Sequence, residues 1–222
     1  MTGLVIATRN AHKVAEIRRI LGESIRLLSQ RDFPGAPSAT EDAGAFAGNA
    51  VKKAEGLAAW LAANSPAAEL AGPFQVLADD SGLEVDALGG APGVHSARFA
   101  AEDAAGAANS SDAANNAKLL RLLQNVPLDR RGARFRCVLA LAAWNKATLL
   151  FEGACEGRIA FSASGAGGFG YDPLFIPDGC AQSFAELGEE VKNTISHRAR
   201  ALAQLRRYLD GCGHEPPVTA PG

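Results

Sequence analysis

Two adjacent carboxylates, Asp79 and Asp80, follow an apolar run and precede Ser81-Gly82. Because Ser-Gly is typical of a turn, the pattern predicts a strand that stops at the two acids. A strand ending there places both acids at the edge of a sheet, where α/β proteins commonly bind ligands. Carboxylate oxygens suit Mg²⁺, which takes a few carboxylates together with substrate phosphates. Glu41 would complete such a site as a third acid, whereas the alternative is a solvated turn.

The segment Thr8-Arg9-Asn10-Ala11-His12-Lys13 follows a short apolar run and leads into a helix. A turn from strand to helix directs backbone N–H groups outward, and the helix dipole favours an anion there. Lys13 adds a positive charge in the first helical turn, where a lysine is otherwise unfavourable. The glycine spacing of a Walker A loop is absent. The segment therefore indicates a phosphate site, with an ordinary helix start as the alternative.

A glycine-rich loop, Gly167-Gly168-Phe169-Gly170-Tyr171-Asp172-Pro173, carries two aromatic residues. Glycines let the backbone approach a flat ligand closely, and Phe169 or Tyr171 is available to stack on it. The alternative is a tight loop whose aromatic rings are anchored in the core. The loop therefore indicates a candidate site for a planar group such as a nucleobase.

Three basic residues, Lys192, His197 and Arg198, lie around the start of the last helix, for which Ser196 is the expected cap. Basic residues at a helix N-terminus oppose the dipole, so a bound anion would relieve the conflict. The alternative is a basic, solvated helix surface. The pattern thus gives a second candidate for ligand binding.

The bulk properties exclude several classes of protein. The net charge of −2 and the lack of a basic run argue against nucleic-acid binding. The four cysteines form no C-x-x-C pair, which argues against a zinc ribbon or redox motif and fits a reducing compartment. No Ser-His-Asp or Cys-His set has a recognisable spacing. No apolar run is long enough to span a membrane and the start does not resemble a signal peptide, so we expect a cytoplasmic protein without membrane partners.

Periodicity and turn residues predict the elements that position these groups. We expect one domain over residues 1–210, with strands at 4–7, 74–78, 134–144 and 148–155 and helices at 13–21, 46–63, from Asp112 and from Ser196. Asn10 and the Ser183/Glu186 capping box mark two helix starts. The Pro/Gly-rich tail, residues 211–222, is expected to be disordered.

Together these segments resemble the Ham1-type family of noncanonical purine nucleoside triphosphate pyrophosphatases, which are inosine/xanthosine triphosphate pyrophosphatases. The resemblance runs from Leu4 to about Leu209. It rests on the order of six motifs: Ala7-Thr8-Arg9-Asn10 with Lys13, Ala78-Asp79-Asp80-Ser81-Gly82-Leu83, Leu88-Gly89-Gly90-Ala91-Pro92-Gly93, Ser96-Ala97-Arg98, Gly168-Phe169-Gly170-Tyr171-Asp172-Pro173 and Ser196-His197-Arg198.

The resemblance implies an elongated α/β fold, with a central mixed sheet flanked by helices and an active-site cleft between two lobes. It implies a homodimer that uses Mg²⁺ to hydrolyse inosine, deoxyinosine and xanthosine triphosphates to the monophosphate and pyrophosphate. It implies metal ligation by Glu41 and Asp80, with Asp80 also the base. We expect Asp79 to support either the turn or the side chains that bind the metal. The implied substrate contacts are Thr8, Arg9, Asn10, Ala11, His12, Lys13, Ser81, Phe169, Gly170, Tyr171, Asp172, Lys192, His197 and Arg198.

The sequence departs from many relatives at three places. Arg9 and Gly48 stand where many relatives have Gly and Glu, and residues 64–72 resemble an insertion. If that glutamate supports the metal, this chain must use another acid or a water molecule.

The mechanism expected from the resemblance is attack of water on the α-phosphorus, with Lys13 and the Asn10 helix start holding the triphosphate. A donor such as Arg198 or Lys192 would recognise the 6-oxo group and reject adenine. Two alternatives remain open at this point. One is another Mg²⁺-dependent house-cleaning nucleotide phosphatase, which acts on different modified nucleotides or releases single phosphates. The other is a nucleotide sensor without catalysis.

Overall fold

The computed structural model describes residues 3–64, 74–101, 109–211 and 218–220 of the chain. The chain divides into two compact units. Unit 1 comprises Met1–Asp80, Cys137–Glu152 and Arg200–Gly222, and unit 2 comprises Ser81–Arg136 and Gly153–Ala199. The peptide bond between Asp80 and Ser81 therefore joins one unit to the other within the motif that the sequence singles out.

The strands are hydrogen-bonded in the order β2-β1-β3-β4-β5-β6, and β7 also pairs with β5. They span β1 Gly3–Ile6, β2 Leu27–Ser29, β3 Phe74–Val85, β4 Gly132–Ala142, β5 Leu149–Ile159, β6 Phe175–Pro177 and β7 Val218–Thr219. Strand β1 runs parallel to β2 and β3, whereas β6 and β7 are antiparallel to β5. This mixed sheet with flanking helices confirms the predicted α/β class.

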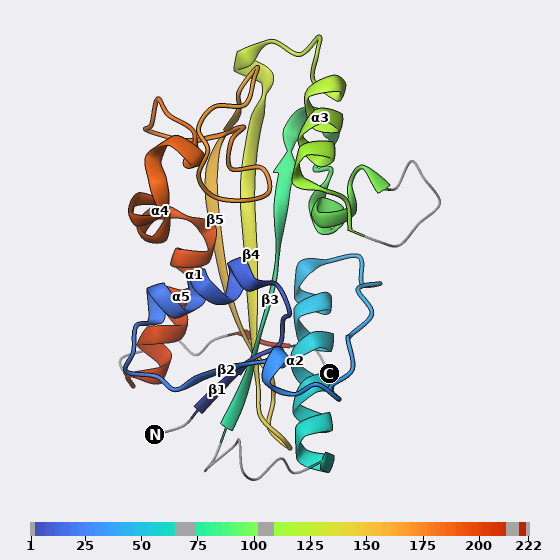
Figure 1. Cartoon of the computed structure of the whole chain (residues 1–222), viewed down its shortest axis with the longest axis vertical. Helices are drawn as coiled ribbons and strands as arrows, with labels where there is room; N and C mark the ends of the chain where they lie inside the picture. The colour runs from blue at the N-terminus through green and yellow to red at the C-terminus, as the bar shows by residue number, and fades with distance from the viewer. Residues whose placement is uncertain (1–2, 65–73, 102–108, 212–217, 221–222) are drawn as a thin grey trace. The chain divides into compact units, whose positions relative to one another are not determined.

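Unit 1 places helices on both faces of its strands. Helices α1 (Ala11–Leu21) and α5 (His197–Leu209) lie on one side, and α2 (Phe46–Asn64) lies on the other (Figure 1). The core on the α1/α5 side combines strand residues with helix residues: Leu4, Ile6, Leu77, Cys137, Leu139, Leu141, Phe151, Val14, Ile17, Leu21, Ala201, Leu202 and Leu205. Because side chains alternate along a strand, the residues between them, such as Val5 and Val76, face α2.

Unit 2 contains α3 (Asp112–Leu122) and α4 (Phe184–Ile195), together with the short 3₁₀ helix η3 (Gly93–Arg98). Its core joins both helices to the strands: Leu83, Val85, Phe99, Leu119, Leu123, Phe135, Tyr171, Leu174, Phe175 and Phe184. The predicted capping box is present, because the Ser183 hydroxyl accepts from the Glu186 N–H and the Glu186 carboxylate accepts from the Ser183 N–H.

Most of the expected elements are confirmed within a few residues. The expected disorder of the 211–222 tail is wrong where the tail is described, since Val218–Thr219 pairs with Leu149 and Leu150 of β5. Backbone pairing with a sheet edge is available to almost any sequence, so composition does not reveal it. The expected insertion at residues 64–72 lies, apart from Asn64, outside the described residues. Among the described helices, none is both long enough and apolar enough to cross a bilayer.

Candidate functional site

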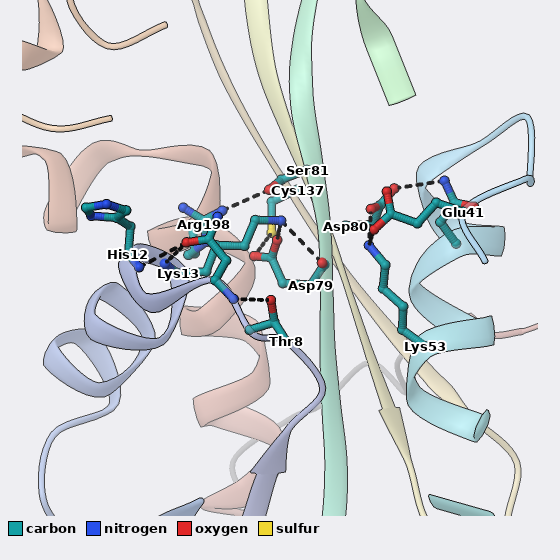
Figure 2. Close-up of polar contacts among 12 residues, drawn as sticks. Thr8, His12, Lys13, Glu41, Lys53, Asp79, Asp80, Ser81, Cys137 and Arg198 are labelled. Carbon is teal, nitrogen blue, oxygen red and sulfur yellow. Dashed lines mark hydrogen bonds and ion pairs between the residues drawn. The ribbon is translucent and has the colours of Figure 1, made fainter. Parts of the chain in front are cut away.

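The two aspartates lie inside strand β3 and not at its end. The predicted turn at Ser81-Gly82 is wrong, because β3 continues to Val85 and buries Leu83 and Val85 in the core of unit 2. That burial outweighs the local preference of Ser-Gly for a turn. Since neighbouring residues of a strand point to opposite faces, Asp79 and Asp80 face different partners, as Figure 2 shows.

Asp79 faces Lys13. One carboxylate oxygen, Oδ1, accepts a hydrogen bond from the Lys13 ammonium at 2.5 Å, and the Asp79 carbonyl lies 3.3 Å from the same nitrogen. The other oxygen, Oδ2, is 3.4 Å from the thiol sulfur of Cys137 on β4. The Asp79 side chain is fully buried. A buried charge is retained only when paired, so Asp79 holds the Lys13 ammonium at a fixed place.

The start of α1 brings Lys13 to that position. The Asn10 side chain accepts from the N–H groups of His12 and Lys13, and the Thr8 hydroxyl accepts from the Asn10 N–H (Figure 2). The predicted N-cap is therefore confirmed. Ala11 and His12 are exposed in the first turn, so the helix start is open to solvent next to the lysine.

Arg9 has a partner outside this segment. Its guanidinium donates to the Ala36 carbonyl at 2.8 Å, and its own carbonyl accepts from Arg31 at 2.9 Å. Arg9 thus fastens the strand-to-helix turn to the 31–36 segment. Its role toward a substrate remains a proposal.

Asp80 faces α2 and shares a lysine with Glu41. The Lys53 ammonium is 2.6 Å from Oδ1 of Asp80 and 2.6 Å from Oε1 of Glu41 (Figure 2). The buried Asn49 side chain donates to Oδ2 of Asp80 at 3.3 Å and accepts from the Ala43 N–H at 3.0 Å. Helix α2 therefore supplies two polar contacts to Asp80 and ties it to the loop that carries Glu41.

The electrostatics of this group favour a basic carboxylate beside a firmly charged lysine. Burial raises the pKa of Asp80 above its ordinary value of 3.8; the charges of Lys53 and Lys13 oppose the shift without cancelling it. Burial works to lower the pKa of Lys53, but the carboxylates of Asp80 and Glu41 outweigh it and raise that pKa above 10.5. Asp80 is thus a better proton acceptor than an ordinary aspartate.

The donor set of Asp80 and Glu41 fits a hard divalent cation. Both carboxylates already contact one positive charge, and oxygen ligands are those that Mg²⁺ prefers. The described residues contain no group of three or more His, Cys, Asp or Glu side chains that could hold a metal. A three-carboxylate site with Asp79 is therefore wrong, because Asp79 faces the other side of β3. A metal at Asp80 and Glu41 would take its other ligands from water and substrate phosphate.

Two neighbouring positions do not join this group. Asp42 is exposed and pairs with Lys52 at 2.5 Å. Gly48 lies in the first turn of α2, and a Cβ added there would lie 2.8 Å from the Cβ of Ala43. A glutamate at position 48 would therefore require the 41–45 segment to shift, and the neighbouring Asn49 contacts Asp80 instead.

Unit 2 gathers the other predicted site residues around Phe169. The Lys192 ammonium lies 4.4 Å above the Phe169 ring and 2.6 Å from Oδ2 of Asp172, and this ion pair is buried. The Arg198 guanidinium donates to the Ser81 hydroxyl at 2.8 Å (Figure 2) and lies 6.0 Å from the same ring. Two cations and a carboxylate thus lie around one aromatic ring, although these residues are separated in the sequence.

The two aromatic rings of the glycine-rich loop have different surroundings. Tyr171 is buried in the core of unit 2, and its hydroxyl donates to the Ser96 carbonyl at 2.9 Å. This favours the alternative of a core anchor for Tyr171 and leaves Phe169, which is half-buried, as the ring available for stacking. Gly168 has a φ of +73° and sits against Asp172, so a side chain there would be strained and would collide.

His197 is buried and stacks on Phe135, with ring centroids 4.8 Å apart. The Ser196 hydroxyl accepts from the Ala199 N–H at 3.2 Å, which confirms the predicted cap. The buried start of α5 also contradicts the alternative of a solvated basic surface, since Arg198 is buried as well.

Several residues of the site were missed from the sequence, above all Lys53, Asn49 and Cys137. Asn49 and Lys53 are four residues apart on α2 and follow the apolar stripe that faces the sheet. Polar residues on such a stripe are unusual, so their spacing relative to Phe46, Ala50 and Leu57 could have indicated them. Cys137 offers no comparable pattern, because a buried cysteine usually serves packing.

Comparison with known proteins shows the family of the chain. The sequence model of the Ham1 family matches residues 4–208. A dITP/XTP pyrophosphatase of Desulforamulus reducens is 50% identical over 208 residues, covering 93% of this chain and 95% of the relative. Another from Geobacter sulfurreducens is 48% identical over 216 residues, covering 97% and 100%. The solved structure of a HAM1 protein from Coxiella burnetii is 36% identical, covers 95% of this chain and 100% of that one, and superposes with a TM-score of 0.79. The chain therefore belongs to the Ham1 family.

Proposed function

We propose that the chain hydrolyses noncanonical purine nucleoside triphosphates, namely inosine, deoxyinosine and xanthosine triphosphates, to the monophosphate and pyrophosphate. The observation that carries the proposal is the pairing of buried charges at Asp79 and Asp80. Lys13 and Lys53 are each held by a carboxylate at about 2.5 Å. Burying charged groups carries a desolvation cost, and such groups are found preferentially at functional sites. The names of the relatives, dITP/XTP pyrophosphatase, supply the substrate class.

The phosphate chain would be bound at the start of α1 and beside Asp80. Lys13 and the open N-terminus of α1 offer an ammonium and backbone N–H groups, which together attract a phosphate. Thr8 and Asn10 hold the turn in that form. Lys53 would add a second cation beside Asp80. In phosphoryl transfer most of the catalysis comes from positioning and charge neutralisation, and these groups supply both.

Asp80 would act as the base. Its pKa is raised by burial, so its carboxylate takes a proton from water more readily than an exposed aspartate does. The oxygen of that water would attack the α-phosphorus, and pyrophosphate would leave with the bonding electron pair. We assign Glu41 and Asp80 as the residues that hold Mg²⁺, which when bound would neutralise phosphate charge and acidify a water molecule.

The base would be bound by Phe169 and Arg198, as the resemblance implies. Phe169 offers a ring for stacking, and the carbonyl at purine position 6 is an acceptor that suits a guanidinium donor. Arg198 is the candidate for this donor, because its guanidinium carries several N–H groups in one plane and lies 6.0 Å from the centre of the Phe169 ring. Adenine presents an amino group at the same position and would leave a buried donor without an acceptor, which is unfavourable.

The proposal has three further parts. The resemblance implies a homodimer and Mg²⁺ as the working metal. The cysteine pattern, which fits a reducing compartment, leads us to propose action in the cytoplasm. Sedimentation velocity tests the dimer, and titration of Mg²⁺ against Ca²⁺ and Mn²⁺ tests the metal.

A panel of nucleoside triphosphates tests the activity. Each nucleotide is incubated with Mg²⁺, and phosphate is measured with and without added inorganic pyrophosphatase. We expect inosine, deoxyinosine and xanthosine triphosphates to release phosphate only when pyrophosphatase is present. Phosphate release without it would favour a phosphatase that removes single phosphates. Tight binding of a nucleotide without turnover would favour a sensor.

A further inference from the structure

Helix α3 holds the backbone of the glycine-rich loop at one residue, Gly170. The Asp112 carboxylate accepts from the Gly170 N–H at 2.7 Å, and the Asn116 side-chain amide donates to the Gly170 carbonyl at 3.0 Å. The two helix residues are four apart and therefore share a face of α3. Both backbone groups of one loop residue are thus bound by one helix, at a sequence separation of more than fifty residues.

Gly170 is the residue between the two aromatic rings of the loop. Its φ of +62° lies in the left-handed region, which glycine adopts without strain. On one side Phe169 donates its N–H to the Asp172 carboxylate at 2.9 Å. On the other side the Tyr171 hydroxyl is fixed to the Ser96 carbonyl. The contacts from α3 therefore fix the backbone of a residue that has no side chain to anchor it.

The two contacts differ from ordinary helix-start chemistry. Helix α3 already has a capping residue, because the Ser111 hydroxyl accepts from the Ala114 N–H at 3.2 Å. An aspartate in the first turn is favourable for the dipole alone, but this does not require its carboxylate to reach Gly170. Asn116 is not a capping residue at all, and its side-chain nitrogen still points to the same loop residue.

We propose that Asp112 and Asn116 are positioning residues that set the affinity for the purine base by fixing the Phe169 ring. The inference rests on the proposed function, in which Phe169 stacks on the base. A loop held in its bound form loses less freedom when the ligand arrives, and this raises affinity. Asp112 and Asn116 act through Gly170 and have no role in the chemical step, so binding of the base should change while phosphate binding does not.

The test uses the variants Asp112→Ala, Asn116→Leu and the double variant in the full-length protein. Inosine monophosphate binding is measured by calorimetry, and the inhibition constant of pyrophosphate is measured in turnover assays. We expect about a tenfold loss of affinity for inosine monophosphate in the double variant, as removal of a charge-assisted bond allows. The pyrophosphate constant should stay within twofold, and KM for inosine triphosphate should rise more than kcat falls.

Two controls separate positioning from general damage. Asp112→Asn keeps an oxygen that accepts from Gly170 and should restore most of the affinity, whereas Asp129→Ala removes an exposed acid elsewhere in unit 2 and should change nothing. Hydrogen exchange of the 168–172 segment should accelerate in Asp112→Ala while exchange in β4 stays unchanged.

The outcomes distinguish this inference from the proposed function. Unchanged exchange in the loop, or faster exchange with unchanged affinity for inosine monophosphate, would overturn the positioning role. Equal weakening of inosine monophosphate and pyrophosphate would also overturn it, since that indicates general damage. If the wild-type protein releases no pyrophosphate from inosine triphosphate, the proposed function fails, and the assignment to base affinity fails with it.

Discussion

Replacing Lys53 with methionine tests what the ion pairs of Lys53 with Asp80 and Glu41 contribute to stability and activity. The change removes an ammonium that is 2.6 Å from both Asp80 and Glu41 and keeps a side chain of similar length. The Asp80 side chain is 8% exposed and that of Glu41 is 36% exposed. Two carboxylates would then face each other with one of them buried.

The size of the effect follows from that burial. Removing one partner of a fully buried ion pair costs about 3–5 kcal/mol. Because Glu41 is partly solvated and Asn49 still donates to Asp80, we expect a loss below that range, about 2–3 kcal/mol, in the free energy of unfolding. Loss of the cation from the phosphate chain should lower kcat/KM for inosine triphosphate about a hundredfold, which corresponds to about 2.7 kcal/mol.

Lys52 supplies a matched control one residue away. Its ammonium pairs with the exposed Asp42, and about half of its side chain is exposed. Lys52→Met should leave both stability and kcat/KM at the wild-type value, because exposed ion pairs contribute little. Urea unfolding and steady-state kinetics measure the two quantities. In addition, Mg²⁺ should raise the melting temperature of Lys53→Met more than that of wild type, since the carboxylates no longer hold an ammonium.

Equal stability of the two variants would refute the assignment of a buried ion pair. Wild-type kcat/KM in Lys53→Met would remove Lys53 from the proposed site even if the stability loss is observed.

Three further predictions follow from the same contacts. Asp80→Asn should abolish pyrophosphate release while circular dichroism and the melting temperature show an intact fold; turnover within tenfold of wild type would exclude Asp80 as the base. Arg198→Ala should raise KM for inosine triphosphate about tenfold or more, because the variant loses one hydrogen bond from a charged group. An unchanged KM would remove Arg198 from base recognition. The pKa of Lys53 lies above 10.5, so its ion pairs stabilise the fold fully below that pH and are lost as pH rises through the raised pKa; wild type should therefore lose melting temperature more steeply than Lys53→Met above pH 10.5, and parallel curves would contradict this.

Local patterns predicted the helix starts well. Asn10 caps α1 and the Ser183/Glu186 box caps α4 because these contacts join residues close in sequence. The motif order also gave the fold class, through resemblance. In each case the information lies within a few residues or within a linear order of motifs.

The end of β3 was not predictable from its local residues. Ser81-Gly82 favours a turn, whereas the long-range pairing and burial of Leu83 and Val85 continue the strand. Once Asp79 and Asp80 are placed inside a strand, their opposite directions follow from its period of two.

The role of Lys53 was also not predictable from its local sequence. A lysine on a helix is usually solvated, and only the positions of Asp80 and Glu41 elsewhere in the chain make this one partly buried and paired. The binding of Gly170 by Asp112 and Asn116 is equally long-range, since no local pattern joins α3 to the glycine-rich loop.

The central claim is that water attacks the α-phosphorus of a noncanonical purine nucleoside triphosphate. Hydrolysis of inosine triphosphate in ¹⁸O-labelled water tests it most directly, with the products analysed by mass spectrometry. The account predicts that one ¹⁸O atom appears in inosine monophosphate and none in pyrophosphate. Label in pyrophosphate, or inosine diphosphate and labelled orthophosphate as the products, would contradict it.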